Sequence, residues 1–140
     1  MIYLDTSVLI AAHTIEPESD RALTWLAANS HEVLAISPWN LTEFASGLSR
    51  KVRTGKLLSE ERDRTATAFA AFRHRTLEML PLHPEHFESA AQMASIADTG
   101  LRASDALHLA IAAEAGCTLA TFDKVFERAA HRFGVPIAKI

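Results

Sequence analysis

The sequence predicts an α/β fold with a mostly parallel central sheet of four or five strands and helices on both faces. Short apolar runs of strand-forming residues alternate with segments of helical periodicity along the chain. No turn of the Asn-Gly type joins two of the predicted strands as a hairpin. Strands that alternate with helices are typical of a parallel sheet, because each parallel connection has to cross over through a helix.

The composition is that of one globular domain over residues 1–140. A hydrophobic fraction of 49% supports a packed core and argues against disorder. No apolar run approaches the roughly 20 residues of a membrane span, and the N-terminus has no basic segment followed by a cleavage site. A single cysteine, Cys117, excludes an internal disulfide and a zinc site of several cysteines. We therefore expect a cytoplasmic protein with no membrane partner.

The first half of the chain is predicted to form two strands and four helices. A strand over 1–5 ends at a carboxylate, and Thr6 or Ser7 is expected to cap the helix that follows. Pro17 fits the first turn of the next helix, and Ser59 is expected to cap the fourth. The predicted ranges are helices at 6–13, 16–29, 40–53 and 59–74 and a second strand at 33–37.

The second half continues the alternation. A helix opened by Pro84 is expected to place Phe87 on its inner face and to end at Gly100. Ser104 is expected to cap the next helix, which ends at Gly116. The remaining predicted elements are strands at 77–82 and 118–121, a helix at 124–133 and a final strand at 136–140.

Four acidic residues interrupt apolar surroundings. Asp5 and Asp123 follow predicted strands, whereas Glu43 and Asp105 lie near the N-terminal ends of predicted helices. Each has a simpler interpretation, because Glu43 and Asp105 would complement helix dipoles, Asp123 would cap a helix and Asp5 would be a solvated strand end. Open α/β sheets bind ligands beyond the carboxyl ends of their strands. Together the four residues indicate a cluster of oxygen ligands for Mg²⁺ or Mn²⁺, since packed carboxylates repel one another without a cation.

The charge balance leaves nucleic-acid binding open. The net charge is −3, but 17 acids less the four above leave 13 against 14 Lys and Arg, a balance of +1. Arg50, on the same predicted helix as Glu43, and Arg102, three residues before Asp105, are candidate contacts to substrate phosphate. The seven histidines form no metal-binding pattern, and His108 is expected on the solvent side of its helix.

Four segments carry a family resemblance, namely LDTSVLI, LTEFASGL, LRASDALHLAIA and LATFDKVF. In this order across the whole chain, they resemble the PIN domain, and in particular the VapC toxins of bacterial type II toxin–antitoxin pairs. The resemblance implies a three-layer α/β/α sandwich and a magnesium-dependent endoribonuclease. The acidic site that it implies is Asp5, Glu43, Asp105 and Asp123, with supporting hydroxyls from Thr6 and Thr121. Phe122 departs from the pattern, because relatives often have a polar residue there.

The same resemblance implies a mechanism and partners. RNA would be hydrolysed to products with 5′-phosphate and 3′-hydroxyl ends, and two metals roughly 3.5–4 Å apart can activate water and stabilise the leaving group. Asp5 would be the central ligand, Asp105 and Asp123 would complete one metal site, and Glu43 would bind a second metal or position the water. The implied partners are a second copy of the chain and a VapB-like antitoxin, whose tail would use an apolar groove beside helices 6–13 and 40–74.

Two other functions are weighed against this one. A PIN-like module that binds RNA or protein without cleaving has no need of all four acids, so their presence argues against it. A phosphatase of the haloacid dehalogenase type needs a second aspartate two residues after its nucleophile. Ser7 stands at that position after Asp5, which argues against the phosphatase.

Overall fold

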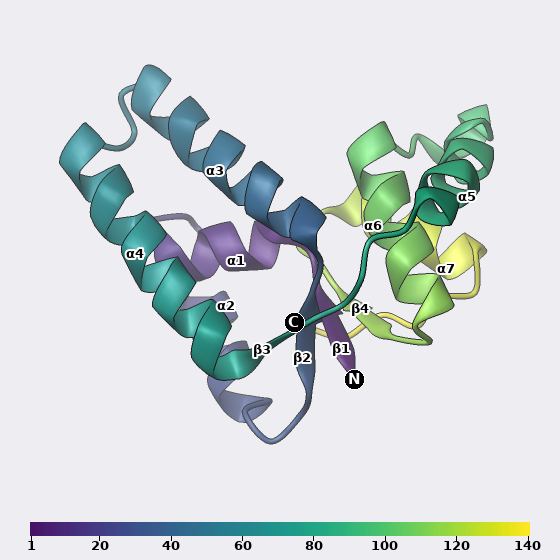
Figure 1. Cartoon of the computed structure of the whole chain (residues 1–140), viewed down its shortest axis with the longest axis horizontal. Coiled ribbons are helices and arrows are strands. Elements are labelled where there is room, and N and C mark those ends of the chain that lie inside the picture. Colours follow the sequence, from purple (N-terminus) through teal and green to yellow (C-terminus); the bar gives the residue numbers. More distant parts are fainter.

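The computed structural model describes all residues, 1–140, and confirms a central sheet of four parallel strands. The strand order is β3-β2-β1-β4. The strands are β1 (Ile2–Leu4), β2 (Leu34–Ile36), β3 (Leu77–Met79) and β4 (Thr118–Ala120). The chain places β2 and β3 on one side of β1 and β4 on the other (Figure 1). The winding direction therefore reverses beside β1, and ligands of open α/β sheets bind at such a point.

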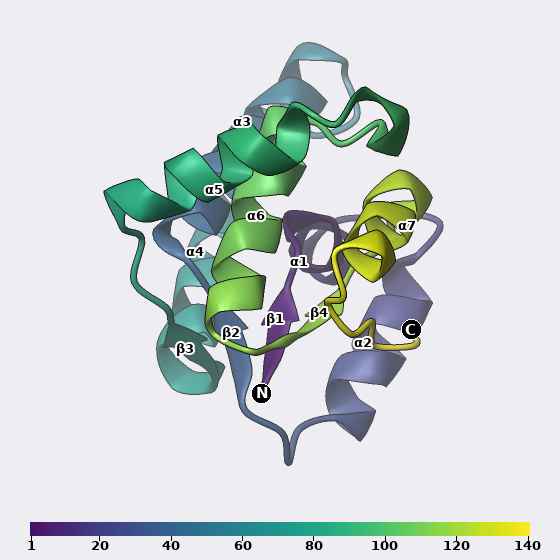
Figure 2. The same ribbon diagram turned by 90° about the vertical axis from the view of Figure 1, so that its right-hand side faces the viewer.

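Helices cover both faces of the sheet and complete a three-layer sandwich (Figures 1 and 2). The layer on one face is α1 (Thr6–His13), α2 (Ser19–Ala28), α3 (Pro38–Arg53) and α4 (Ser59–Thr76). The layer on the other face is α5 (Pro84–Ala94), α6 (Ala103–Glu114) and α7 (Lys124–Arg132). In Figure 2 this second layer lies in front of the sheet. None of the helices is both long and apolar enough to cross a membrane.

The alternation of side chains along β1 divides the core in two. Ile2 and Leu4 pack with α1, α3 and α4, whereas Tyr3 points to the opposite face and packs with α5, α6 and α7. All three residues are buried. A strand that is buried on both faces has apolar side chains at successive positions, so a strand such as β1 was recognisable in the sequence as a continuous apolar run.

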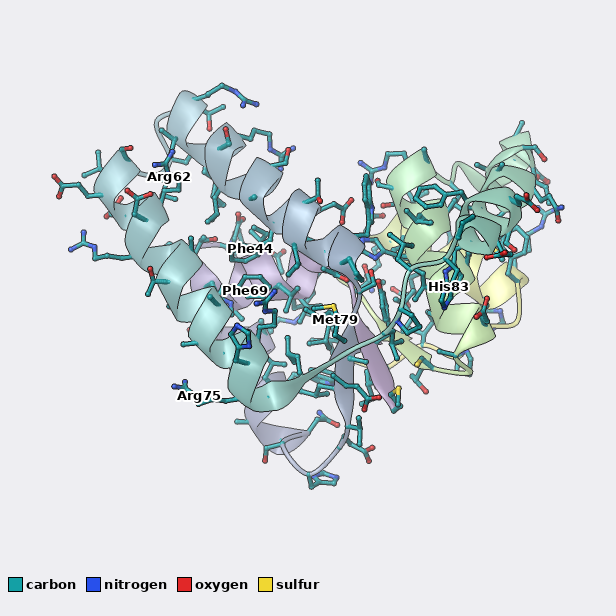
Figure 3. The ribbon with its side chains drawn as sticks, in the orientation of Figure 1. Phe44, Arg62, Phe69, Arg75, Met79 and His83 are labelled. Atoms are coloured by element: carbon teal, nitrogen blue, oxygen red, sulfur yellow. The ribbon has the colours of Figure 1, made fainter.

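Aromatic rings fill the space between α1, α3 and α4. Phe44 and Phe69 stack with ring centroids 4.0 Å apart, and Figure 3 shows them pointing toward one another from α3 and α4. His13 of α1 meets both rings nearly edge-on. Gly47 permits the close approach of α1 to α3, because a Cβ atom there would lie 3.0 Å from Cδ1 of Ile10. Aromatic side chains therefore pack on one another beside the place where the apolar groove is expected.

Several predicted helix starts are wrong by a few residues. Asp5, rather than Thr6 or Ser7, caps α1, because its carboxylate accepts the backbone N–H of Ser7. Helix α3 begins two residues earlier than predicted, after Ser37, whose backbone N–H is accepted 2.8 Å away by the side chain of Asn40. In both cases the capping group is held by the fold, which a local pattern does not show.

Three further helix predictions need correction. Ser59 and Ser104 lie inside α4 and α6, which are preceded at their N-caps by Leu58 and Arg102. Pro17 precedes α2 instead of lying in its first turn.

The predictions for α5 and the chain end also need correction. Helix α5 ends at Ala94, before a 3₁₀ turn over Ala97–Thr99, and its Phe87 is 52% exposed. The predicted final strand is reduced to one bridge between Leu119 and Ile137. The chain end is held instead by side chains, since Trp25 Nε1 donates to the carbonyl oxygen of Lys139.

Candidate metal centre

The register of the sheet brings the first acid of the site beside β4. Leu4 pairs with Ala120, so the residues that follow these strands, Asp5 and Thr121, are neighbours. The backbone N–H of Asp5 donates to the carbonyl oxygen of Ala120 over 2.9 Å. The Thr121 hydroxyl then donates to Oδ2 of Asp5 over 2.8 Å. Residues 116 positions apart in the chain therefore meet at the carboxyl edge of the sheet.

The Asp5 carboxylate is buried and oriented by hydroxyl groups. Only 6% of the residue is exposed. Its Oδ2 also accepts the Ser7 hydroxyl over 2.5 Å, and the oxygen of that hydroxyl accepts the backbone N–H of Phe122 over 3.1 Å. Since the hydroxyls of Ser7 and Thr121 both donate to Oδ2, the other oxygen of Asp5, Oδ1, is the one available to a ligand.

Glu43 reaches the same place from the second turn of α3. Its Oε2 accepts the Thr6 hydroxyl over 2.7 Å and Nε2 of His108 over 2.5 Å. Burial would raise the pKa of Glu43, but its contacts with His108, Thr6 and Ser104 outweigh burial and lower that pKa. Glu43 is therefore ionised at neutral pH, as a metal ligand has to be.

Asp105 and Asp123 form a second pair, bridged by Arg102. Nε of Arg102 lies 3.1 Å from Oδ2 of Asp105, and its Nη2 is bonded to Oδ2 of Asp123. Oδ1 of Asp123 caps α7 by accepting the backbone N–H groups of residues 125 and 126. Burial raises the pKa of Asp105; the charge of Arg102 opposes this rise and the charges of Asp5 and Asp123 add to it. A cation bound here would relieve that repulsion.

All four carboxylates line one cleft of about 590 Å³. Residues of α3 extend the cleft away from the acids, and this extension ends in two arginines, Arg50 and Arg53. Arg50 makes no ion pair within the protein. Glu16 and Glu18 also line the cleft, so its wall combines carboxylates with the two arginines of α3. Carboxylates suit a bound cation, and an unpaired arginine suits an anionic substrate.

The structure places the predicted site residues as follows. The four acids share the cleft, Thr6 and Thr121 bond to two of them, and Arg50 lines the wall. Their grouping differs from the prediction, because the ligand atoms of Asp5, Glu43 and His108 lie within 4.8 Å of one another, whereas Asp105 and Asp123 share Arg102. Arg102 thus binds carboxylates in this structure, and its contact to phosphate stays a prediction.

Most of the other basic residues lie outside the cleft. Lys51 is buried and pairs with Glu16. Arg62 and Arg75 lie toward opposite ends of α4 (Figure 3) and do not line the cleft. A nucleic-acid contact near the acids therefore depends on Arg50 and Arg53 rather than on the whole basic run.

The prediction for His108 is wrong, because this side chain is fully buried and points into the site. A signal for it was present in the sequence. His108 is three residues after Asp105, and residues at this spacing share a helix face. The very apolar sequence of α6 concealed it, since no solvent-facing side of this helix segment exists: residues 106–112 are all buried.

The donor set fits a hard divalent cation. Carboxylate oxygens dominate it, and these are the protein ligands that Mg²⁺ and Mn²⁺ prefer. Asp5, Glu43, Asp105 and Asp123 place four negative groups around one cleft, and Arg102 pairs with two of them. The residues present therefore match the metal that the family resemblance implies.

A parallel sheet with carboxylates gathered beyond β1 and β4 agrees with the PIN domain. The family model of the PIN domain matches residues 2–132, and the chain belongs to this family. No protein with curated annotation matches the sequence.

Solved structures of toxin–antitoxin proteins share the fold. VapC20 of Mycobacterium tuberculosis is 24% identical, with a TM-score of 0.73 over 92% of this chain and 95% of that chain. VapBC2 of Rickettsia felis is 20% identical, with a TM-score of 0.72 over 99% and 98%. FitAcB of Neisseria gonorrhoeae is 23% identical, with a TM-score of 0.69 over 99% and 97%.

Metal binding is expected to raise the melting temperature. A ligand that binds only the folded state stabilises it by about 2.7 kcal/mol at 100 times its Kd. Scanning calorimetry with Mg²⁺ or Mn²⁺ should show a clear rise for the wild type and a much smaller one for Asp5→Asn. The control is Asp63→Asn, whose carboxylate is exposed on α4, and it should respond as the wild type does. An equal rise in Asp5→Asn and the wild type would contradict the role of Asp5.

Proposed function

We propose that this protein is an endoribonuclease that depends on Mg²⁺ or Mn²⁺ and acts as the toxin of a VapBC-like toxin–antitoxin pair. The observation that carries the proposal is that the four predicted carboxylates and two arginines of α3 line one cleft. Hydrolysis of a phosphodiester requires a nucleophilic water, a stabilised leaving group and a held phosphate. The four carboxylates supply a place for the cation, and Arg50 and Arg53 supply contacts for phosphate.

The metal would be held by Asp5, Glu43, Asp105 and Asp123. When bound, such a cation supplies Lewis acidity toward a phosphate oxygen and lowers the pKa of its bound water. The protein's own groups do the rest. Ser7 and Thr121 keep Oδ1 of Asp5 facing the cleft, and Thr6 orients Glu43. Glu43 either binds a second metal or positions the attacking water.

The family and its relatives support the nuclease and the partner. The M. tuberculosis VapC20 structure is described as that of a toxin that cleaves the sarcin–ricin loop. The R. felis VapBC2 structure is described as bound to a DNA fragment from its promoter. By analogy, we propose RNA as the substrate of this chain, an antitoxin as its partner and a homodimer as its assembly.

The experiment that tests the function is cleavage of labelled RNA with Mg²⁺ or Mn²⁺, beside an RNA-binding titration in EDTA. Binding without cleavage across cellular RNAs would favour a non-catalytic module.

Arg50→Ala is expected to weaken RNA binding without abolishing it. Each phosphate contact that is lost lowers the slope of log K against log salt by about 1. The measurement is an RNA titration in EDTA at several salt concentrations. Arg75→Ala removes the same charge outside the cleft (Figure 3) and should leave the slope unchanged. If the two variants behave alike, Arg50 does not contact phosphate.

Coexpression with the small protein of the neighbouring reading frame is expected to yield a stable complex and to abolish toxicity. Since aromatic rings fill the space between α1, α3 and α4, we expect the antitoxin tail to enter the cleft itself, beside Ile10 and Gly47. Copurification and cell growth after induction measure both effects. Toxicity that persists with no copurification would contradict the pairing.

A further inference from the structure

We propose that Tyr3 and His108 are positioning residues, which fix the orientation of the Glu43 carboxylate through a chain of buried hydrogen bonds. The inference rests on the proposed function, since it assigns a role toward the same metal centre. Neither residue touches the exposed wall of the cleft, because both are fully buried. Their effect on a bound metal would be exerted through Glu43.

The hydrogen bonds connect the core of the sheet to the site. The Tyr3 hydroxyl on β1 lies 2.8 Å from Nδ1 of His108 on α6. Nε2 of His108 lies 2.5 Å from Oε2 of Glu43 on α3. Three separate elements are thereby joined, by residues up to 105 positions apart in the sequence. The phenol ring of Tyr3 also packs against the imidazole, with ring centroids 5.6 Å apart.

We assign the proton of His108 from the hydrogen-bond distances around its ring. An imidazole nitrogen 2.5 Å from a carboxylate oxygen has to carry a proton, because two lone pairs would repel at that separation. Nε2 is therefore the donor to Glu43. A neutral imidazole with Nε2–H accepts at Nδ1, and the nearest donor to Nδ1 is the Tyr3 hydroxyl. Tyr3 thus holds the tautomer that serves Glu43.

The surroundings of Tyr3 keep its hydroxyl in this role. Burial, the largest cause, raises the pKa of Tyr3 far above its ordinary value, so the phenol keeps its proton. The Asn40 side chain is fixed, because its nitrogen donates to the carbonyl oxygen of Leu4 over 2.9 Å and its oxygen accepts the backbone N–H of Ser37. The Ser37 hydroxyl, 2.8 Å from the Tyr3 oxygen, is then able to donate to it. The Tyr3 hydroxyl reaches two acceptors, Oδ1 of Asn40 at 3.0 Å and Nδ1 of His108 at 2.8 Å. Oδ1 of Asn40 already accepts the Ser37 N–H, whereas Nδ1 of His108 has no other partner, so we assign the Tyr3 proton to His108.

The consequence concerns the two oxygens of Glu43. His108 and Thr6 both donate to Oε2, so the carboxylate cannot rotate without breaking two hydrogen bonds. Oε1 is then the oxygen that faces a cation or a water. Hydrogen-bond partners of metal ligands typically contribute about 10- to 100-fold to metal affinity. His108 acts as such a partner and not as a ligand, because its Nε2 is occupied by a proton.

The test measures Mn²⁺ binding to the protein without RNA, by titration calorimetry. His108→Leu removes the donor, and the Mn²⁺ Kd is expected to rise by about 10-fold or more. His108→Gln, whose amide nitrogen replaces Nε2–H, is expected to restore most of the affinity. Tyr3→Phe removes one oxygen atom and preserves the shape of the core, and its Kd is expected to rise less than that of His108→Leu. Leu107→Ala, a buried residue of the same helix, controls for lost stability and should bind Mn²⁺ as the wild type does.

Nitrogen NMR of the metal-free wild type gives a second, independent reading. We expect protonated Nε2 and an accepting Nδ1 at His108. The inference is overturned by the opposite tautomer, by wild-type Mn²⁺ affinity in His108→Leu, or by a His108→Gln variant that binds as poorly as His108→Leu. None of these outcomes involves RNA. Failure of the proposed nuclease would instead appear as an absence of cleavage by a wild type that binds Mn²⁺.

Discussion

Asp5→Asn and Asp105→Asn are each expected to lower the rate of RNA cleavage by about 100-fold or more, which is typical of losing a preorganised electrostatic group. Asparagine keeps the size of the side chain and an oxygen that accepts a hydrogen bond. At Asp5 that oxygen still receives Ser7 and Thr121. The fold should therefore survive, and the lost property is the negative charge that holds the metal.

RNA binding separates this effect from a general loss of function. Phosphate contacts come from arginine and lysine and not from the acids, so both variants should bind RNA in EDTA at least as tightly as the wild type. The measurement pairs cleavage of a labelled RNA in Mg²⁺ with a binding titration of each variant. Asp63→Asn, on the surface of α4, should cleave normally. Wild-type cleavage by Asp5→Asn and Asp105→Asn would disprove the assignment of the acidic site.

Phe126→Ala is expected to lower the free energy of unfolding by about 3–5 kcal/mol, the usual cost of removing a buried phenyl ring. Phe126 is fully buried in the core formed by α5, α6 and α7. Domains of this size are stable by only about 5–15 kcal/mol, so a large share of the stability would be lost. The ring also lies beside His108, with centroids 6.5 Å apart, on the helix that Asp123 caps.

Urea denaturation measures this loss. Phe87→Ala is the matched control, because the same side chain is removed from α5 at a position that is 52% exposed. It should cost much less than Phe126→Ala. Equal losses in the two variants would mean that Phe126 is not part of the buried core of this layer.

The order of strands and helices was predictable because β1, β2 and β4 are largely buried on both faces, whereas β3 is mostly exposed. The runs around Tyr3, Ala35 and Leu119 contain almost no polar residue, and the helices between them show apolar periodicity. The acids were recognisable for the same reason, since a carboxylate such as Asp5 or Asp105 stands out in an apolar segment. The position of Asp5 at the end of a parallel strand then predicted a site at the sheet edge.

The exact helix starts were less predictable. Ser59 and Ser104 are good capping residues by type, yet each lies inside its helix. Asp5 was assigned to the metal site, and it both caps α1 and lines the cleft. Asp123 likewise caps α7 and lines the cleft. The capping and the proposed functional roles of these two acids are therefore compatible, a combination that sequence patterns alone do not reveal.

The sequence by itself determined the α/β class, the order of the elements and the four acids, because these depend on local periodicity and on residue type. Only the tertiary structure decided how the acids group and which side chains orient them. His108 was expected on the surface, but it is buried and donates to Glu43. Arg102 was expected to contact phosphate, but it bridges Asp105 and Asp123 in the structure. The physical reason is that these hydrogen bonds join residues distant in the chain, such as Tyr3 and His108. Their partners become neighbours only when the parallel strands align and both helical layers pack against the sheet.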